Sequence, residues 1–115
     1  MKMVRVEATY VENSVATEDI LLFDVLIKDD SSVRAMKIFG YAIDDGETWP
    51  LYIEPKGEEG RLCWGAGERD TDSTLNVFQR HMRRGEYLTR VDICNGEKSE
   101  YTYRITHVYD WSDVR

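Results

Sequence analysis

Cysteine and histidine are scarce in this sequence, which has two residues of each among 115. Cys63 and Cys94 fit no CxxC spacing, and we expect both thiols to be reduced because disulfides belong mainly to secreted proteins. The spacing of the two cysteines and two histidines also matches no zinc motif. The sequence therefore predicts no metal site and no cofactor.

Long hydrophobic runs are also missing. No stretch approaches the roughly twenty apolar residues that a membrane-spanning helix needs, and the opening MKMVRVEATYVE lacks the apolar core of a signal peptide. These absences predict a cytoplasmic protein with no membrane partner. With 42% hydrophobic residues, we expect residues 1–115 to form a single domain around one buried core.

Basic residues are fewer than acidic ones, 15 against 22, and the net charge is −7. This balance repels phosphate backbones and argues against nucleic acid as a partner. The one strongly basic segment is RHMRRGEYLTR, residues 80–90. Motifs for covalent catalysis, such as GxSxG, are absent from the sequence, which favours a non-catalytic role.

The first half of the chain is typical of an antiparallel meander. Apolar and polar residues alternate over residues 4–10, which predicts a half-buried strand. Residues 20–27 and 35–43 are apolar on both faces and predict buried central strands, with a short helix as an alternative for the first. The segment TWPLYIEP predicts an edge strand, because Pro50 and Pro55 cannot donate hydrogen bonds to ladders on both sides.

One amphipathic helix is expected near residues 73–84. Polar residues at its start can cap the first free amides, and Gly85 suits the left-handed conformation that ends a helix. On a helical wheel an apolar stripe faces the sheet and three arginines face solvent. The stripe consists of Leu75, Phe78 and Met82, and the arginines are Arg80, Arg83 and Arg84.

Two registers are open for a C-terminal hairpin around Asn95 and Gly96. A two-residue turn would place charged residues on the apolar face, so we predict a three-residue loop at residues 94–96 with a positive φ at Gly96. That register pairs oppositely charged residues across the strands. The pairs are Glu86 with Arg104, Arg90 with Glu100 and Asp92 with Lys98, and the opposite, core-facing side carries Tyr87, Thr89, Val91, Tyr101, Tyr103 and His107.

Together these patterns predict an α+β fold, mainly an antiparallel sheet made of a meander and a C-terminal hairpin, with one helix. A curl of the sheet toward a half-barrel is an alternative. Because residues 20–27 and 35–43 are apolar on both faces and one helix covers only one face, we expect the second face to meet another copy of the chain. The expected partner is therefore a second copy, with another protein as the alternative.

Two functional hypotheses compete. The first is a small acidic, non-catalytic binding or protein-interaction domain, because aromatic and arginine side chains often anchor interfaces. Its candidate partner-binding or ligand-binding residues are Trp49, Tyr52, Trp64, Arg80, Arg83 and Arg84. The second is a protein with a small-molecule pocket between helix and sheet. If this protein is an enzyme, a histidine beside tyrosines acts as its general acid or base. Its candidate residues are His107 or His81, with Tyr103 and Tyr87.

Overall fold

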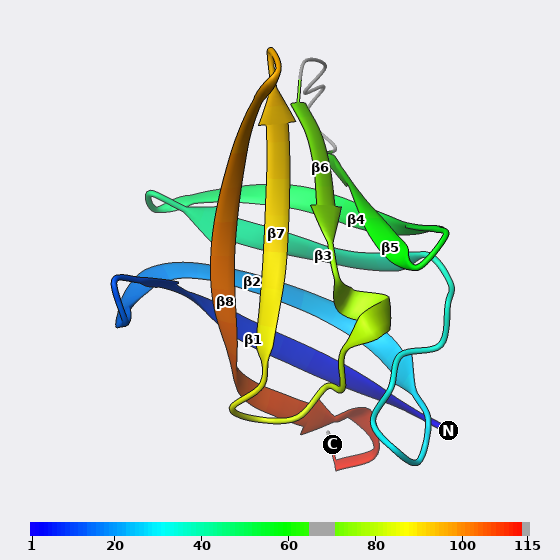
Figure 1. The fold of residues 1–115 in the computed structure, drawn as a ribbon. Helices are drawn as coiled ribbons and strands as arrows, with labels where there is room; N and C mark the ends of the chain where they lie inside the picture. The colour runs from blue at the N-terminus through cyan, green and yellow to red at the C-terminus, as the bar shows by residue number, and fades with distance from the viewer. Residues whose placement is uncertain (65–70, 114–115) are drawn as a thin grey trace.

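The computed structural model describes residues 1–64 and 71–113. They form a closed barrel of eight antiparallel strands in chain order, in which β8 returns to pair with β1 (Figure 1). The strands are β1 (Lys2–Glu12), β2 (Val15–Ile27), β3 (Ile38–Asp44), β4 (Glu47–Lys56), β5 (Glu59–Trp64), β6 (Thr71–Leu75), β7 (Tyr87–Cys94) and β8 (Glu97–Asp110).

The predicted α+β class is wrong. Residues 1–64 and 71–113 contain two short 3-10 turns, η1 (Val77–Gln79) and η2 (Trp111–Asp113), and no α-helix. The expected meander is present, but the sheet closes completely instead of stopping at a half-barrel. Closure leaves no free edge and buries the inner face of every strand, which is the role that the helix was expected to fill.

The segment expected to be a helix, residues 73–84, begins as strand β6. Ser73 and Leu75 are 1% and 0% exposed and point into the barrel, while β6 pairs with β5 on one side and β7 on the other. Hydrogen bonds to two neighbouring strands outweigh a helical stripe of only three apolar residues. Asn76 ends the strand, where its backbone N–H donates to the Thr89 carbonyl and its Oδ1 accepts from the Thr89 N–H.

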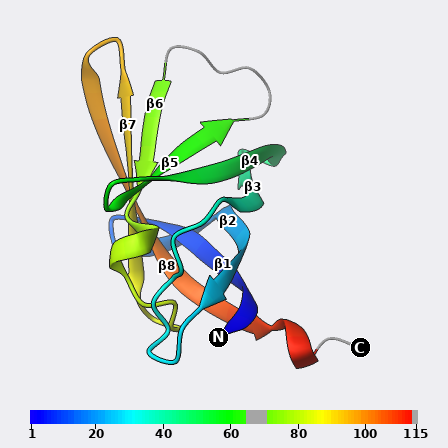
Figure 2. The same ribbon diagram turned by 90° about the vertical axis from the view of Figure 1, so that its right-hand side faces the viewer.

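The rest of that segment closes one end of the barrel. Residues 76–86 lie against residues 28–37, and the Met82 N–H donates to the Ser31 carbonyl at 2.8 Å (Figure 2). Val33 from the first-half segment and Val77 and Met82 from the second are buried, and their side chains cover this end of the core. We call this the closed end; the turns β1–β2, β3–β4 and β7–β8 lie at the opposite, open end (Figure 1).

The three N-terminal strands were predicted correctly as strands, and their inward side chains form the apolar core. Strand β4 is not an edge strand, because it pairs with both β3 and β5. Among the described residues, Pro50 pairs with Tyr41 of β3, and Pro55 pairs with Gly60 of β5.

The C-terminal hairpin uses the register that the sequence analysis rejected. Cys94 pairs with Glu97 and Arg90 with Tyr101, so the turn has two residues. Asn95 and Gly96 have φ values of +52° and +79°, which matches the left-handed pair of a type I′ turn. The positive φ of Gly96 is confirmed, whereas the predicted three-residue loop and its cross-strand charge pairs are wrong.

This register turns Leu88, Arg90 and Asp92 toward the interior. Tyr87 instead lies outside, 46% exposed, opposite Arg104. The hydrophobic pattern favours the other register only if every inward position is apolar, whereas the open end of this barrel has a polar interior.

Candidate binding surfaces

A charged network occupies the interior at the open end. The Arg90 guanidinium donates to both carboxylate oxygens of Asp92, with Nε–Oδ1 at 2.9 Å and Nη2–Oδ2 at 2.7 Å. It also donates to the Tyr103 hydroxyl at 3.3 Å. The rings of Trp64 and Tyr101 lie 4.8 and 5.1 Å from the guanidinium carbon. A cation held between two aromatic rings gains further electrostatic stabilisation.

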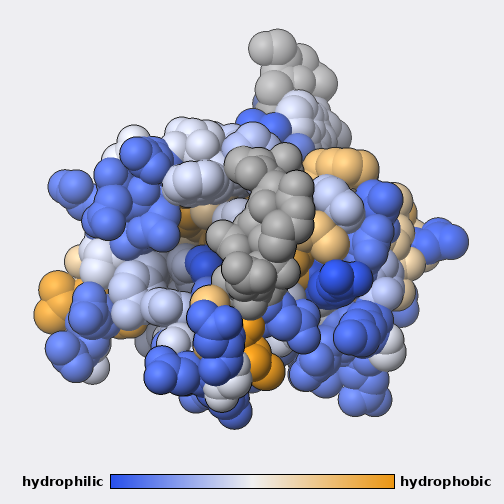
Figure 3. Space-filling model, turned by 90° about the horizontal axis from the view of Figure 1, so that it is seen from above, coloured by the Kyte–Doolittle hydropathy of each residue, from blue (hydrophilic) through white to orange (hydrophobic). Residues whose placement is uncertain are grey.

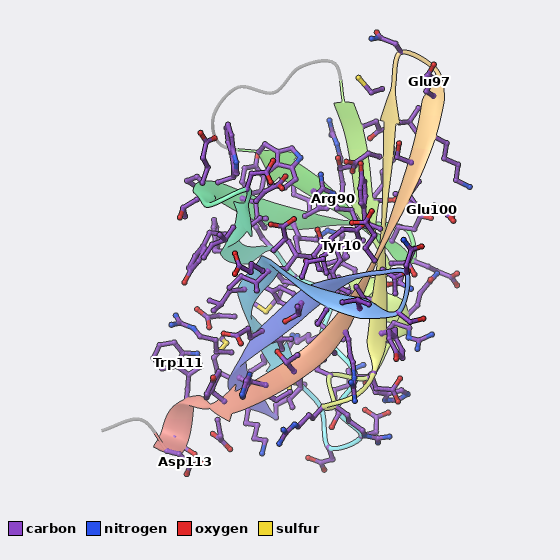
Figure 4. All side chains as sticks on the ribbon, turned by 90° about the vertical axis from the view of Figure 1, so that its left-hand side faces the viewer. Tyr10, Arg90, Glu97, Glu100, Trp111 and Asp113 are labelled. Atoms are coloured by element: carbon purple, nitrogen blue, oxygen red, sulfur yellow. The ribbon has the colours of Figure 1, made fainter. Side chains whose placement is uncertain are left out.

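Tyr10 extends this network toward β1. Its ring centroid lies 5.7 Å from those of Tyr101 and of Tyr103, and both Tyr10 and Arg90 are labelled in Figure 4. The aromatic rings therefore surround the ion pair on several sides. This arrangement leaves the Arg90 and Asp92 side chains only 14% and 13% exposed.

Burial shapes the acid–base properties of this network. Burial raises the pKa of the Tyr103 hydroxyl, and the nearby Arg90 charge offsets this only in part. Burial also acts to lower the pKa of Arg90, but the hydrogen bonds and charge interactions with Asp92 and Tyr103 together outweigh it, and the pKa of the guanidinium stays above its usual value. Within the described part of the chain, no buried side-chain nitrogen or oxygen lacks a hydrogen-bond partner. The network is satisfied internally.

Three carboxylates gather at the rim of the open end. One oxygen each from Asp19, Asp44 and Asp45 lies within 4.8 Å of the others. Burial, followed by the charges of Asp19 and Asp45, raises the pKa of Asp44. Seen from above, the coloured surface around this end is mostly hydrophilic (Figure 3). Two of the three carboxylates are exposed, and we assign them no metal.

Aromatic and aliphatic side chains also cover part of the outer surface. On β3, Phe39, Tyr41 and Ile43 alternate with the inward residues 38, 40 and 42, and Phe39 is 63% exposed. Cross-strand neighbours extend this set onto β2 and β4. We call the resulting surface the β2–β4 face. Leu22 is its buried centre, 8% exposed, and the more exposed members are Ile20, Phe39, Tyr41, Ile43, Pro50 and Tyr52.

The structure separates the aromatic residues that the sequence singled out. Tyr52 lies on the β2–β4 face, where its ring centroid is 6.2 Å from that of Phe39 and 4.9 Å from the Lys37 ammonium. Trp64 and Trp49 belong to the inward series of their strands near the open end, and Trp49 is 38% exposed there. These three residues therefore do not form one patch.

The candidate arginines lie at the closed end. Arg80 pairs with Glu86 at 3.2 Å, and Arg83 donates to the Asp30 carbonyl at 3.0 Å. Arg84 is exposed. Because Trp49 and Trp64 lie toward the open end, the arginines and these aromatic residues do not share a surface.

The histidine pocket is not assembled either. His107 is on the outer surface, where its Nδ1 lies 3.0 Å from Glu7 Oε2 and its ring stacks on Tyr109. A β-bulge explains this position: Glu7 pairs with His107 but Ala8 with Ile105, so Thr106 is an extra residue that reverses the alternation. Tyr103 points inward and Tyr87 outward.

The other histidine also makes a local contact. His81 lies at the closed end, where its Nδ1 is 2.7 Å from the Asp30 carbonyl oxygen. It therefore shares no site with His107, Tyr103 or Tyr87.

Arg90 with Asp92, and Phe39 with Tyr41, were missed as candidate site residues. The sequence signal for the first pair was the two-residue spacing, which places both side chains on one face of a strand, beside an Asn-Gly turn. The signal for the second was an aromatic residue on each side of Gly40 within a segment that is apolar on both faces.

Comparison with known protein families, curated proteins and solved structures finds no significant match for this chain. In the described ranges, no helix has the length and apolar character needed to cross a membrane.

Proposed function

We propose that this protein is a non-catalytic protein-interaction barrel that associates through the β2–β4 face, with a second copy of the chain as its partner. The observation that carries this proposal is the 63% exposure of Phe39, which lies between Asp24 and Tyr52 at one end of an apolar surface on three paired strands. The barrel fills its interior with other side chains, so this face contributes little to the core. A contiguous exposed apolar surface is characteristic of an interface.

The charges beside the face favour a two-fold arrangement. Asp45 and Glu47 lie at the tip of the β3–β4 hairpin. Lys56 lies at its other end together with Lys37, whose ammonium also contacts Glu54 at 3.5 Å. In an isologous pair the two hairpins can run antiparallel, which brings each lysine end next to the acidic tip of the other copy. Such a pairing gives the face a partner of matching apolar and charged character.

Mass measurement by light scattering after size exclusion tests this proposal. We expect a dimeric mass at about 50 µM protein, since specific homodimers commonly have micromolar or tighter dissociation constants. The double variant Phe39→Ser/Tyr52→Ser should be monomeric and remain folded.

Tyr87→Ser is the matched control. Tyr87 is 46% exposed on a different part of the barrel, on β7, so its removal should leave the dimer intact. A monomeric mass for the unmodified protein, or dimer loss in the Tyr87 variant equal to that in the Phe39/Tyr52 variant, would contradict the proposal.

A further inference from the structure

The outer surface of β1, β7 and β8 has a depression of about 440 Å³, which we call the saddle. It is centred on a row of residues across three strands, in which Arg104 pairs with Thr9 on one side and Tyr87 on the other. The β1–β2 hairpin projects past β8 and forms one wall (Figure 1). The lining residues are Thr9, Val11, Asn13, Ser14, Ala16, Tyr87, Thr102, Arg104 and Thr106.

Two strand irregularities accompany this concave shape. Thr106 is the extra residue of the β8 bulge, and its Oγ1 donates to the Glu7 carbonyl at 3.2 Å. In β2, residues 17–19 are inserted opposite Tyr10, and the Thr17 hydroxyl donates to the Tyr10 carbonyl at 2.9 Å. Bulges bend strands and increase their twist. The depression therefore rests on fixed backbone features.

The lining has a distinctive chemistry. Hydroxyl groups come from three threonines and a serine, an amide comes from Asn13, and an aromatic ring comes from Tyr87. Arg104 supplies the only positive charge among the lining side chains. Arg5, Arg80 and Arg90 are each paired with a carboxylate, whereas Arg104 has no ion-pair partner in the described chain. Its planar donors are therefore available for a ligand carboxylate.

We infer that the saddle binds an acidic monosaccharide, a hexuronate. Arg104 receives the carboxylate, and the half-exposed Tyr87 ring packs against the C–H face of the sugar. Thr102 and Asn13 exchange hydrogen bonds with the sugar hydroxyls. A volume of about 440 Å³ lies within the usual size of small-molecule sites.

The charge distribution selects this ligand class over polyanions. The saddle has one cationic side chain in a chain of net charge −7, so nucleotides and other multiply charged phosphates are repelled. A simple carboxylate satisfies Arg104 but makes no use of the Thr102 hydroxyl and the Asn13 amide. A sugar that carries one carboxylate uses both features.

Titration of the amide NMR spectrum with glucuronate, glucose, acetate and inorganic phosphate tests the inference. We expect glucuronate to shift the amides of Thr9, Thr102 and Thr106 at the lowest concentration, with glucose weaker. Arg104→Gln should weaken glucuronate binding about tenfold, the value of one charge-assisted contact, and remove its preference over glucose. Tyr87→Ser should weaken binding of both sugars.

Phe39→Ser is the matched control and should bind glucuronate normally, which separates this site from the β2–β4 face. Each variant's amide spectrum verifies its fold. Equal affinity for acetate and glucuronate would reduce the saddle to a general anion site and overturn the inference, as would tighter binding of phosphate. The absence of saddle shifts with glucuronate, or unchanged affinity in the Arg104 variant, would also overturn it.

Discussion

At the closed end of the barrel Leu88 is fully buried among aliphatic side chains, whereas two residues further along the same strand Arg90 points into the interior between two aromatic rings. The closed end removes apolar area from water and needs no specific geometry beyond close packing. The open end instead depends on directed contacts between Arg90, Asp92 and Tyr103. One barrel interior thus combines two kinds of stabilisation, and the two can be separated by mutation.

The largest effect is expected at the closed end. Leu88→Ala should lower the free energy of unfolding by about 2–5 kcal/mol, because it removes buried methyl groups and leaves a cavity in a rigid core. Urea denaturation followed by tryptophan fluorescence measures this change. Ile93→Ala, on the same strand but 44% exposed, is the control and should change stability by no more than about 0.5 kcal/mol. Equal losses in both variants would remove the distinction between inner and outer positions.

At the open end, Arg90→Met should cost about 2 kcal/mol, because it leaves the Asp92 carboxylate in the interior without its charged partner. The double variant Arg90→Met/Asp92→Leu should recover most of this loss, since an apolar pair of similar size removes both charges. The same urea denaturation measures both variants. A double variant as unstable as the single one would mean that the directed contacts themselves, and not only charge balance, hold the open end.

The sequence alone predicts the strands that follow simple rules. Alternation over residues 4–10 and apolar runs at 20–27 and 35–43 identify β1, β2 and most of β3, because inward positions near the closed end are consistently apolar. Barrel closure was missed, because it depends on the pairing of β1 with β8, which are separated by almost the whole chain. No local pattern specifies such a contact.

The candidate sites were harder to predict for related reasons. The register of the last hairpin was misjudged because the interior near Arg90 is polar, so the hydrophobic pattern favoured the wrong pairing. The orientation of His107 depends on the single extra residue Thr106, which periodicity cannot reveal. The β2–β4 face, by contrast, was anticipated in part, because apolar character on both sides of a strand predicts a second buried surface.

Turn chemistry should be the same at both ends even though the interiors differ. Gly96 at the open end and Gly57 at the closed end have φ values of +79° and +61° and open space around their Cα atoms. Replacement of either by valine should cost about 1–2 kcal/mol, because β-branched residues are strained in the left-handed region. Thermal or urea unfolding of the two variants gives the comparison. A much larger loss at one turn would show that this turn also supports its end of the barrel.

The smallest effects concern two aspartates, the exposed Asp44 and the half-buried Asp110, and we expect opposite signs. Burial and the neighbouring carboxylates raise the pKa of Asp44 at the open end. Near the chain's C-terminus, hydrogen bonds from Ser112 and then from Lys2 lower the pKa of Asp110 to about 2. When folding raises the pKa of a carboxyl group, the group favours the folded state only at pH values below its pKa in the unfolded chain. That contribution is lost as the pH rises through its pKa in the folded protein. When folding lowers the pKa of a carboxyl group, the group stabilises the folded state at pH values above its pKa in the unfolded chain. That contribution is lost as the pH falls through its pKa in the folded protein.

At about pH 7, where both carboxyl groups are ionised, Asp44→Asn should therefore increase stability and Asp110→Asn should decrease it. Urea denaturation over a range of pH checks both variants. The difference between the Asp44 variant and the unmodified protein should disappear below about pH 4, the ordinary carboxyl value. That of the Asp110 variant should persist until the pH approaches 2. A loss of stability in both variants at neutral pH would mean that the carboxylates at the open end do not repel one another. Asp44 would then stabilise the folded state as Asp110 does.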